Sequence, residues 1–356
     1  MNCIDRALRI VILSPVLVGL LSMPVWAGGE AVPARAITVS PVILELTGPM
    51  ADAQAEISSM AWKGDTLAIL PQDPTIFAEE GKLGFFVIDR SRIIAAIDQT
   101  NTEPILPREV KCLSPEMSEL IMGYDGFEAL GLAGNRCFFT IEAEPDSAMA
   151  SYLLSGVFDV VNHEIVLDVS RFSKIPMGVN IPNIAEEAIV IDGDQVITIA
   201  EANGKNVNPR PAANVFNVNG EFQSILPMPQ IEYRVTDATA IDKEGRFWVI
   251  NYYYPPEHDK LDPAPDPETA QYGDGEVFDP DRCVERLLEL RIVRTCLGGD
   301  WIERTDTPPI NLELSDTGDC RNWEALVRLE GRGFLLMTDK YPSTLLAFVP
   351  YQPTED

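Results

Sequence analysis

The stretch Glu128-Ala-Leu-Gly-Leu-Ala-Gly-Asn-Arg-Cys-Phe-Phe-Thr-Ile-Glu142 decides the fold. It joins a short apolar strand, a tight glycine-bearing turn and a second apolar strand, which is the pattern of a β-hairpin. A polar residue bounds the unit at each end, Glu128 at the start and Glu142 at the close. Because the first and last residues of a hairpin lie side by side, we expect these two carboxylates at one end of the unit.

The same unit recurs along the chain, and two further strand-like runs follow most copies. After the first copy these runs are Gly84–Asp89 and Arg92–Ile97, and the segment Asp98–Gly126 is expected to be a loop. Repeats of four strands are typical of a β-propeller, in which each repeat forms one blade. The last copy lacks an outer strand, which the segment 42–46 near the N-terminus can supply. The sequence therefore predicts an all-β protein, a β-propeller with five blades favoured and six possible, closed by an N-terminal strand in the last blade. A β-sandwich is the alternative. The units open at Ser58, Glu128, Glu187, Asp237 and Glu324.

The first 27 residues have the layout of a secretory signal peptide. Arg6 and Arg9 precede an apolar run over 10–21, and Val25-Trp26-Ala27 is a small-residue cleavage site. We therefore expect a secreted or periplasmic protein whose residues 28–356 form a single propeller domain. An acidic, proline-rich loop insertion at about 255–285 is expected to be a solvated, flexible flap.

The chain is strongly acidic, with a formal net charge of −28. This charge argues against nucleic acid and anionic membrane surfaces as partners. No segment after the signal peptide is long and apolar enough to span a bilayer, so we expect no membrane anchor. The expected partner is a small phosphorylated substrate or an unknown ligand, and the expected state is a monomer.

The opening residues of the five units line the central channel of a propeller. Several carboxylates that meet there repel one another unless they are protonated or neutralised by a cation. Oxygen ligands from several directions suit Ca²⁺ better than Zn²⁺. The sequence therefore predicts a calcium site, and the alternative is a water-filled polar channel. The predicted metal ligands are Ser58, Glu128, Glu187, Asp237 and Glu324.

The closing residues of the hairpins form a second ring just outside the first. We expect Glu142 or Asp339 to orient an attacking water, and Lys340 or Lys205 to stabilise developing charge. Ion pairing between Lys340 and Asp339 is the competing interpretation. With two histidines in the whole chain, a histidine-based zinc site or a Ser-His-Asp site is improbable.

Long connections fall on one face of the propeller, the face that also carries the paired polar groups. Binding and catalytic residues are usually found on such loops. Cys283 and Cys320 both lie on this face in adjacent blades, and we predict that they form a disulfide. Export makes disulfides possible.

Three short strings carry a resemblance to known propellers, namely Ile57-Ser-Ser-Met-Ala-Trp62, Gly126-Phe-Glu-Ala-Leu130 and Asn322-Trp-Glu-Ala-Leu326. They resemble the Ser-Gly-Leu and Glu-Gly-Leu motifs of the phytase-like propeller family with esterase-like activity. The order Ser, Glu, Glu, small polar, Glu also resembles the five-bladed calcium-activated apyrases. That resemblance implies a central Ca²⁺ held by Ser58, Glu128, Glu187 and Glu324, with Asp237 where the apyrases have Ser.

Two functions follow from these observations. The first is an exported, calcium-dependent phosphoester or phosphoanhydride hydrolase, phytase-like or apyrase-like. The second is a non-catalytic, calcium-stabilised propeller that binds a ligand or a protein on its long-loop face. The fold alone does not decide between them, because propellers host many functions.

Overall fold

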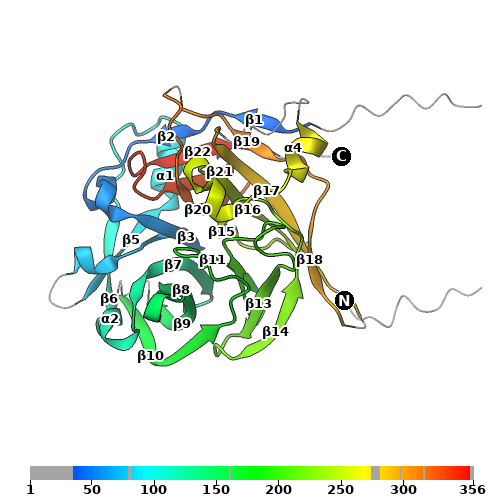
Figure 1. Ribbon diagram of the computed structural model, residues 1–356. Coiled ribbons are helices and arrows are strands. Elements are labelled where there is room, and N and C mark those ends of the chain that lie inside the picture. The colour runs from blue at the N-terminus through cyan, green and yellow to red at the C-terminus, as the bar shows by residue number, and fades with distance from the viewer. Residues whose placement is uncertain are drawn as a thin grey trace, which may run out of the picture.

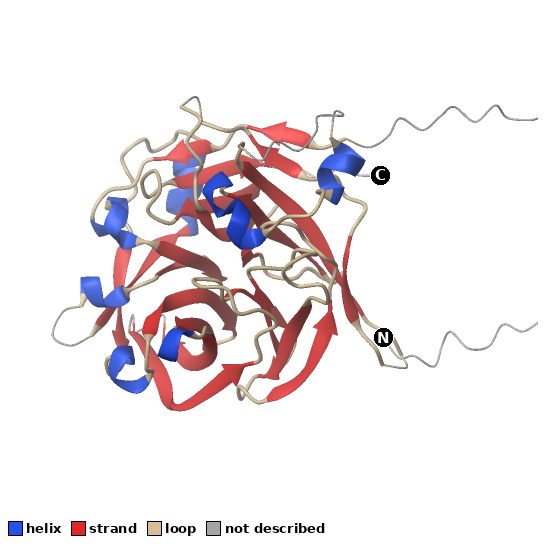
Figure 2. Ribbon diagram, in the orientation of Figure 1, coloured by secondary structure: helices blue, strands red, loops and turns tan. Residues whose placement is uncertain are grey.

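The computed structural model describes residues 35–78, 82–159, 162, 164–273, 281–296, 298–315 and 317–352. The predicted signal peptide, residues 1–27, lies outside the described residues. Strands dominate the molecule, and short helices lie in the connections between them (Figure 2). Among the described residues, no helix is long and apolar enough to cross a membrane.

The strands form five antiparallel blades around a common centre, which confirms the predicted propeller (Figure 1). The first strands of the blades are neighbours in a closed ring, because each contacts the first strand of the blade before it and of the blade after it. These innermost strands are β3 (Ile57–Lys63), β7 (Tyr124–Ala133), β11 (Glu186–Asp192), β15 (Arg234–Ala238) and β20 (Trp323–Leu329).

Blades 1 and 2 share one eight-stranded sheet, since their outermost strands pair in parallel. Blade 1 continues from β3 with β4 (Thr66–Pro71), β5 (Leu83–Asp89) and β6 (Arg108–Leu113). Blade 2 continues from β7 with β8 (Arg136–Ala143), β9 (Ala150–Asp159) and β10 (Glu164–Ile175). Blade 3 is a separate sheet of β11, β12 (Gln195–Ala200), β13 (Ala212–Asn217) and β14 (Phe222–Pro227).

Both ends of the chain close the ring. Blade 4 consists of β15, β16 (Arg246–Tyr253) and β17 (Val284–Val293), flanked by β18 (Trp301–Arg304) and β19 (Ile310–Leu312). The N-terminal strand β1 (Ile37–Val39) pairs in parallel with β19. Blade 5 consists of β20, β21 (Gly333–Thr338) and β22 (Leu346–Pro350), and β2 (Val42–Leu44) completes it as predicted.

A hydrophobic cluster fills each of the five interfaces between neighbouring blades. Between blades 1 and 2, the Phe127 ring packs edge-on against Phe85 and Phe139, with centroids 6.0 and 5.4 Å apart. Apolar side chains on both faces of each sheet explain why the strands read as nearly continuous apolar runs. Tight turns with glycine at positive φ, such as Gly134 at 59° and Gly193 at 63°, join the inner strands.

One predicted strand is wrong. The run Arg92–Ile97 was expected to be the outer strand of blade 1, but it lies in helix α1 (Arg90–Ile97). Its apolar residues Ile93, Ala96 and Ile97 follow helical spacing and pack into the cluster between blades 5 and 1. The outer strand is β6, which lies within a segment expected to be a loop.

The acidic insertion is more ordered than a solvated flap over residues 255–273. It forms a 3₁₀ turn (Pro255–Glu257), α3 (His258–Leu261) and α4 (Pro267–Tyr272). Asp266 caps α4 and receives two hydrogen bonds, of 2.7 and 2.9 Å, from the buried guanidinium of Arg286. The other helical elements are α2 (Met117–Leu120) and 3₁₀ turns at Pro49–Ala51, Ala53–Ala55, Pro74–Phe77 and Pro145–Ser147.

Candidate functional site

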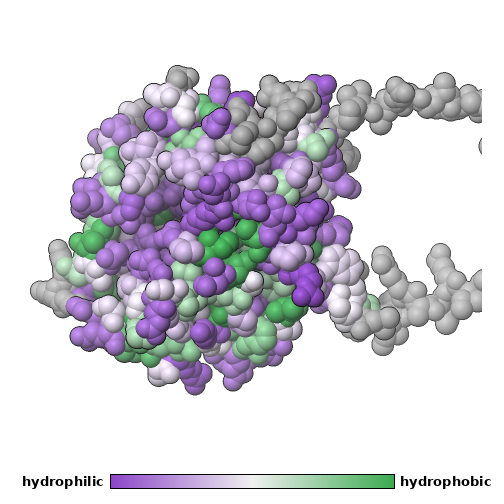
Figure 3. Space-filling view, viewed as in Figure 1, coloured by the Kyte–Doolittle hydropathy of each residue, from purple (hydrophilic) through white to green (hydrophobic). Residues whose placement is uncertain are grey.

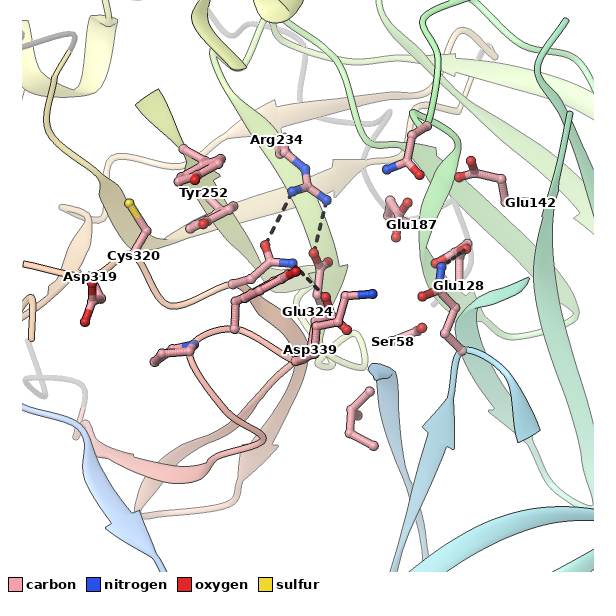
Figure 4. Close-up of a pocket in the computed structure, with 18 residues that line it drawn as sticks. Ser58, Glu128, Glu142, Glu187, Arg234, Tyr252, Asp319, Cys320, Glu324 and Asp339 are labelled. Atoms are coloured by element: carbon pink, nitrogen blue, oxygen red, sulfur yellow. Dashed lines mark hydrogen bonds and ion pairs between the residues drawn. The ribbon is translucent and has the colours of Figure 1, made fainter. Parts of the chain in front are cut away.

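A pocket of about 550 Å³ opens where the innermost strands begin (Figure 4). Hydrophilic residues cover much of the surface around the centre of the molecule (Figure 3). Six carboxyl side chains and two basic side chains line the pocket, and all five blades contribute to it. The charged lining residues are Glu128, Glu142, Glu187, Glu324, Asp319, Asp339, Arg234 and Lys340.

A β-bulge at the start of blades 1, 2, 3 and 5 positions the polar side chains that open these blades. The pairing register of each first hairpin slips across Ser58, Glu128, Glu187 and Glu324, so each is the extra residue of a bulge. A bulge turns its extra residue away from the ordinary alternation of the strand. The repeated bulge thus explains how four strands aim a polar side chain at the axis from an otherwise apolar strand.

Blade 4 departs from this pattern. Its irregularity spans two residues between Val235 and Ala238, and it leaves Asp237 outside the pocket lining. The buried Asp237 carboxylate instead accepts hydrogen bonds from the backbone N–H groups of Ala238 and Leu326, at 2.8 and 2.7 Å. Ser59 Oγ donates a third, at 3.3 Å. Asp237 therefore joins blades 4, 5 and 1.

Arg234 is the residue of blade 4 that faces the pocket, and sequence reasoning missed it. Its guanidinium pairs with Glu201, with Glu324 at 3.0 Å and with Glu257 at 3.8 Å. Its charge also lies over the ring of Tyr252, 5.6 Å from the centroid. Burial lowers the pKa of Arg234, but these carboxylates raise it by more, so Arg234 is a permanent cation. The signal that could have found it is an arginine three residues before Asp237, at the end of the hairpin where the polar residues gather.

Glu128 and Glu187 form the opposite side of the pocket. Burial raises the pKa of both carboxyl groups well above the usual range, and neighbouring glutamates raise it further. Glu128 accepts a hydrogen bond of 3.1 Å from Gln72, and this bond lowers the pKa of Glu128. No ion pair joins either group to a basic side chain in the described part of the chain. Burial therefore favours the protonated form of both groups.

The predicted second ring is partly in the pocket. Burial raises the pKa of Glu142 to about 8, with Glu201 and Asp125 as further causes, and its Oε1 atom is buried without a hydrogen-bond partner. Burial also raises the pKa of Asp339, while the backbone N–H and the ammonium of Lys340 lower it. Figure 4 shows Glu142 and Asp339 on different sides of the pocket.

The two predicted lysines have different positions. Lys340 lines the pocket, and its ammonium donates to Glu56 at 2.6 Å. The expected pairing of Lys340 with Asp339 is thus replaced by one with Glu56. Lys205 lies outside the pocket lining, and its backbone N–H donates to Glu232 at 3.0 Å.

The predicted disulfide between Cys283 and Cys320 is confirmed. It fixes the segment before β20 to the start of β17, and Cys320 reaches the pocket. Glu285 holds the same segment, because it accepts from the backbone and side chain of Arg321 and from Trp323 Nε1 at 2.7 Å. Asp319 and Asn322 are therefore placed at the pocket by a fixed segment.

One observation favours a metal ion in the pocket and another opposes it. The buried atoms Glu142 Oε1 and Glu324 Oε2 have no hydrogen-bond partner, as expected for oxygens that await a ligand. Yet across the described ranges no three acidic, cysteine or histidine side chains are grouped closely enough to hold an ion. The carboxyl groups line a cavity rather than converge on one point.

Comparisons with known proteins give structural neighbours only. No family model matches the chain, and no curated protein matches it. One similar solved structure is a glycosyl hydrolase from Bacteroides ovatus, with 8% identity, a TM-score of 0.40 and coverage of 94% of this chain and 96% of that one. Another is a mutant α-L-arabinanase from Cellvibrio cellulosa, with 10% identity, a TM-score of 0.39 and coverage of 88% and 91%. A third is the GH43_1 enzyme from Xanthomonas citri, with 8% identity, a TM-score of 0.45 and coverage of 87% and 92%.

These comparisons correct two predictions. Membership of the phytase-like family is wrong, because the neighbours are glycoside hydrolases and no family model matches. The predicted phosphoester or phosphoanhydride hydrolase is wrong as well. The pocket gives a physical reason, since its two basic side chains are already paired with glutamates, which leaves neither of them to bind a phosphate.

Proposed function

We propose that the axial pocket hydrolyses a glycosidic bond in a small saccharide, with Glu142 as the proton donor and Asp339 as the base. The observation that carries this proposal is the environment of Glu142. It is a buried carboxyl with a pKa of about 8 that lines the same pocket as Asp339. Hydrolysis of a glycoside uses two carboxyl groups, of which one must carry a proton and the other must be ionised.

Glu142 suits the donor role because burial keeps its proton in place at neutral pH. A carboxyl at its ordinary pKa of 4.5 has lost its proton at pH 7 and cannot protonate a leaving oxygen. The unpartnered Oε1 atom leaves Glu142 free to form a hydrogen bond with a substrate.

Asp339 suits the base role because positive groups adjoin it. Burial and the charge of Glu56 raise the pKa of Asp339, and the backbone N–H and the ammonium of Lys340 oppose that rise and favour its ionised form. Asn322 Nδ2 donates to Asp339 Oδ2 at 3.3 Å and helps to orient the carboxylate. An ionised carboxylate in this position accepts a proton from an attacking water.

A saccharide suits the rest of the lining. A volume of about 550 Å³ is within the ordinary range for small-molecule sites. Sugar hydroxyl groups are neutral, so they form hydrogen bonds with the many carboxyl groups and need no basic side chain. Tyr252 and Tyr254 add aromatic surface, and Tyr254 is 44% exposed.

A panel of nitrophenyl glycosides tests the proposal. We expect hydrolysis of at least one member, and a loss of roughly 10²–10⁴-fold in kcat for Glu142→Gln, the usual contribution of a proton donor. Activity should also fall as pH rises through about 8, because Glu142 then loses its proton. Glu186→Gln is the matched control, since Glu186 is a buried neighbour of Glu187 outside the pocket lining.

Two results contradict the proposal. One is the absence of hydrolysis across the panel by folded protein. The other is hydrolysis that Glu142→Gln and Glu186→Gln reduce equally, which assigns the loss to a general effect on the fold.

Calcium is a second candidate for this pocket. It is favoured by the two orphaned oxygens Glu142 Oε1 and Glu324 Oε2. Its ligands would come from Ser58, Glu128, Glu187 and Glu324, which have to move closer together to bind an ion. Calorimetric titration with calcium chloride, in the protein and in Glu187→Gln, tests this candidate. We further propose that the protein acts outside the cytoplasm on a small molecule, as the signal-peptide pattern of residues 1–27 indicates.

A further inference from the structure

Acidic side chains outnumber basic side chains in the lining of the pocket. Both basic side chains are engaged, Arg234 with Glu201 and Glu324 and Lys340 with Glu56. Glu128 and Glu187 are each 5% exposed and lie on the adjacent strands β7 and β11, and the charge of Glu128 raises the pKa of Glu187. The pocket can therefore accept a further positive charge at little electrostatic cost.

Glu187 is the clearest unpartnered group. Its side chain lines the pocket, and it forms no hydrogen bond or ion pair with another described residue. The unpartnered oxygens of Glu142 and Glu324 lie in the same lining. Buried polar atoms in native proteins nearly always have a partner, so these atoms indicate that a donor comes from a ligand.

The arrangement suits an organic cation better than a metal ion. A calcium ion needs six or more oxygens about 2.3–2.6 Å from one centre, and no group of three candidate side chains in the described residues meets that need. An ammonium group carries three N–H donors, each of which reaches an acceptor at about 2.8 Å. On a sugar ring the ammonium also brings hydroxyl groups that fill the rest of the cavity.

We infer that the saccharide bound in this pocket carries a protonated amine, and that Glu128 and Glu187 bind its ammonium group. This inference rests on the proposed function for the identity of the ligand as a sugar. It names the substrate class as amino sugars with a free amine, and it makes Glu187 a specificity-determining residue. Glu324 is already paired with the guanidinium of Arg234, which repels an amine there, so the ring binds with its amine at Glu128 and Glu187.

Calorimetric titration with three sugars tests this. At about pH 6, where such an amine is protonated, glucosamine should bind at least about tenfold more tightly than glucose or N-acetylglucosamine. Glu187→Gln should remove this preference, because glutamine has the same shape without the charge. Glu186→Gln, one residue away and buried outside the pocket lining, should retain it. Circular dichroism of both variants checks that they fold.

Three outcomes overturn the inference, and a fourth contradicts only the proposed function. Equal binding of all three sugars shows that the pocket does not select an amine. A preference for glucosamine that survives in Glu187→Gln shows that Glu187 does not bind it. Both results leave hydrolysis of neutral glycosides possible. Tight binding of calcium chloride that is lost in Glu187→Gln, with no glucosamine binding, assigns these glutamates to a metal. Glucosamine binding without hydrolysis on the glycoside panel supports the amine site and contradicts the proposed function alone.

Discussion

The two sides of the axial pocket differ in how they neutralise buried carboxyl groups. On the side of blades 4 and 5, Arg234 pairs with Glu201 and Glu324, so the positive charge is built into the chain. On the side of blades 2 and 3, Glu128 and Glu187 occupy equivalent strand-opening positions without a basic partner. One repeated bulge therefore supports both a structural ion pair and a ligand-binding carboxyl pair.

The difference shows that position in the repeat does not fix the role of a residue. Glu324 and Glu187 are both the extra residue of a bulge, and both are buried. Glu324 serves to hold blade 5 to blade 4 through Arg234. Glu187 contributes no such contact, and its buried charge is tolerable only with a proton or a bound cation.

The largest expected effect is a loss of stability on the side of blades 4 and 5, where Arg234 pairs with two glutamates. Arg234→Leu leaves Glu201 and Glu324 buried without a counter-charge, and we expect a loss of about 3–5 kcal/mol in the free energy of unfolding by urea. Arg246→Leu is the control on the same hairpin, because its side chain is 42% exposed and its ion pair with Asp242 is worth at most about 1 kcal/mol. A similar small loss in both variants would show that Arg234 is not the counter-charge of the axis.

A smaller loss of stability is expected for substitution of Asp237. This substitution tests whether the Asp237 carboxylate is structural or binds a ligand. Asp237→Ala leaves the backbone N–H groups of Ala238 and Leu326 without an acceptor, at a cost of about 1–3 kcal/mol in unfolding free energy. Sugar binding by the folded variant should be unchanged. Loss of binding at unaltered stability would place Asp237 in the pocket after all.

Much of the fold could be predicted from the sequence because the hairpin repeat is a local pattern. Apolar strands on either side of a glycine turn specify each hairpin, and the missing outer strand of blade 5 requires a segment from elsewhere. The run Arg92–Ile97 was misread because a short apolar run fits a strand or a helix equally well. In the structure the run is a helix, because helical spacing packs both Ile93 and Ile97 between blades 5 and 1.

The site was predicted less completely, for a geometrical reason. Counting from hairpin to hairpin locates Glu128, Glu187 and Glu324 correctly at the pocket. In blade 4 the register also shifts by one residue, but Asp237, which the same count selects, is held by backbone N–H groups, and Arg234, three residues earlier, lines the pocket. Sequence spacing does not show which of these two side chains lines the pocket.

The central claim is that burial keeps carboxyl groups at the axis protonated at neutral pH. Infrared spectroscopy measures this directly, because a protonated carboxyl has a C=O stretching band that a carboxylate lacks. The account predicts a band at pH 7 that weakens in Glu142→Gln and fades as pH rises through about 8. A protein without that band at pH 7, whose axial carboxyl groups all titrate near the ordinary value of 4.5, would contradict the account.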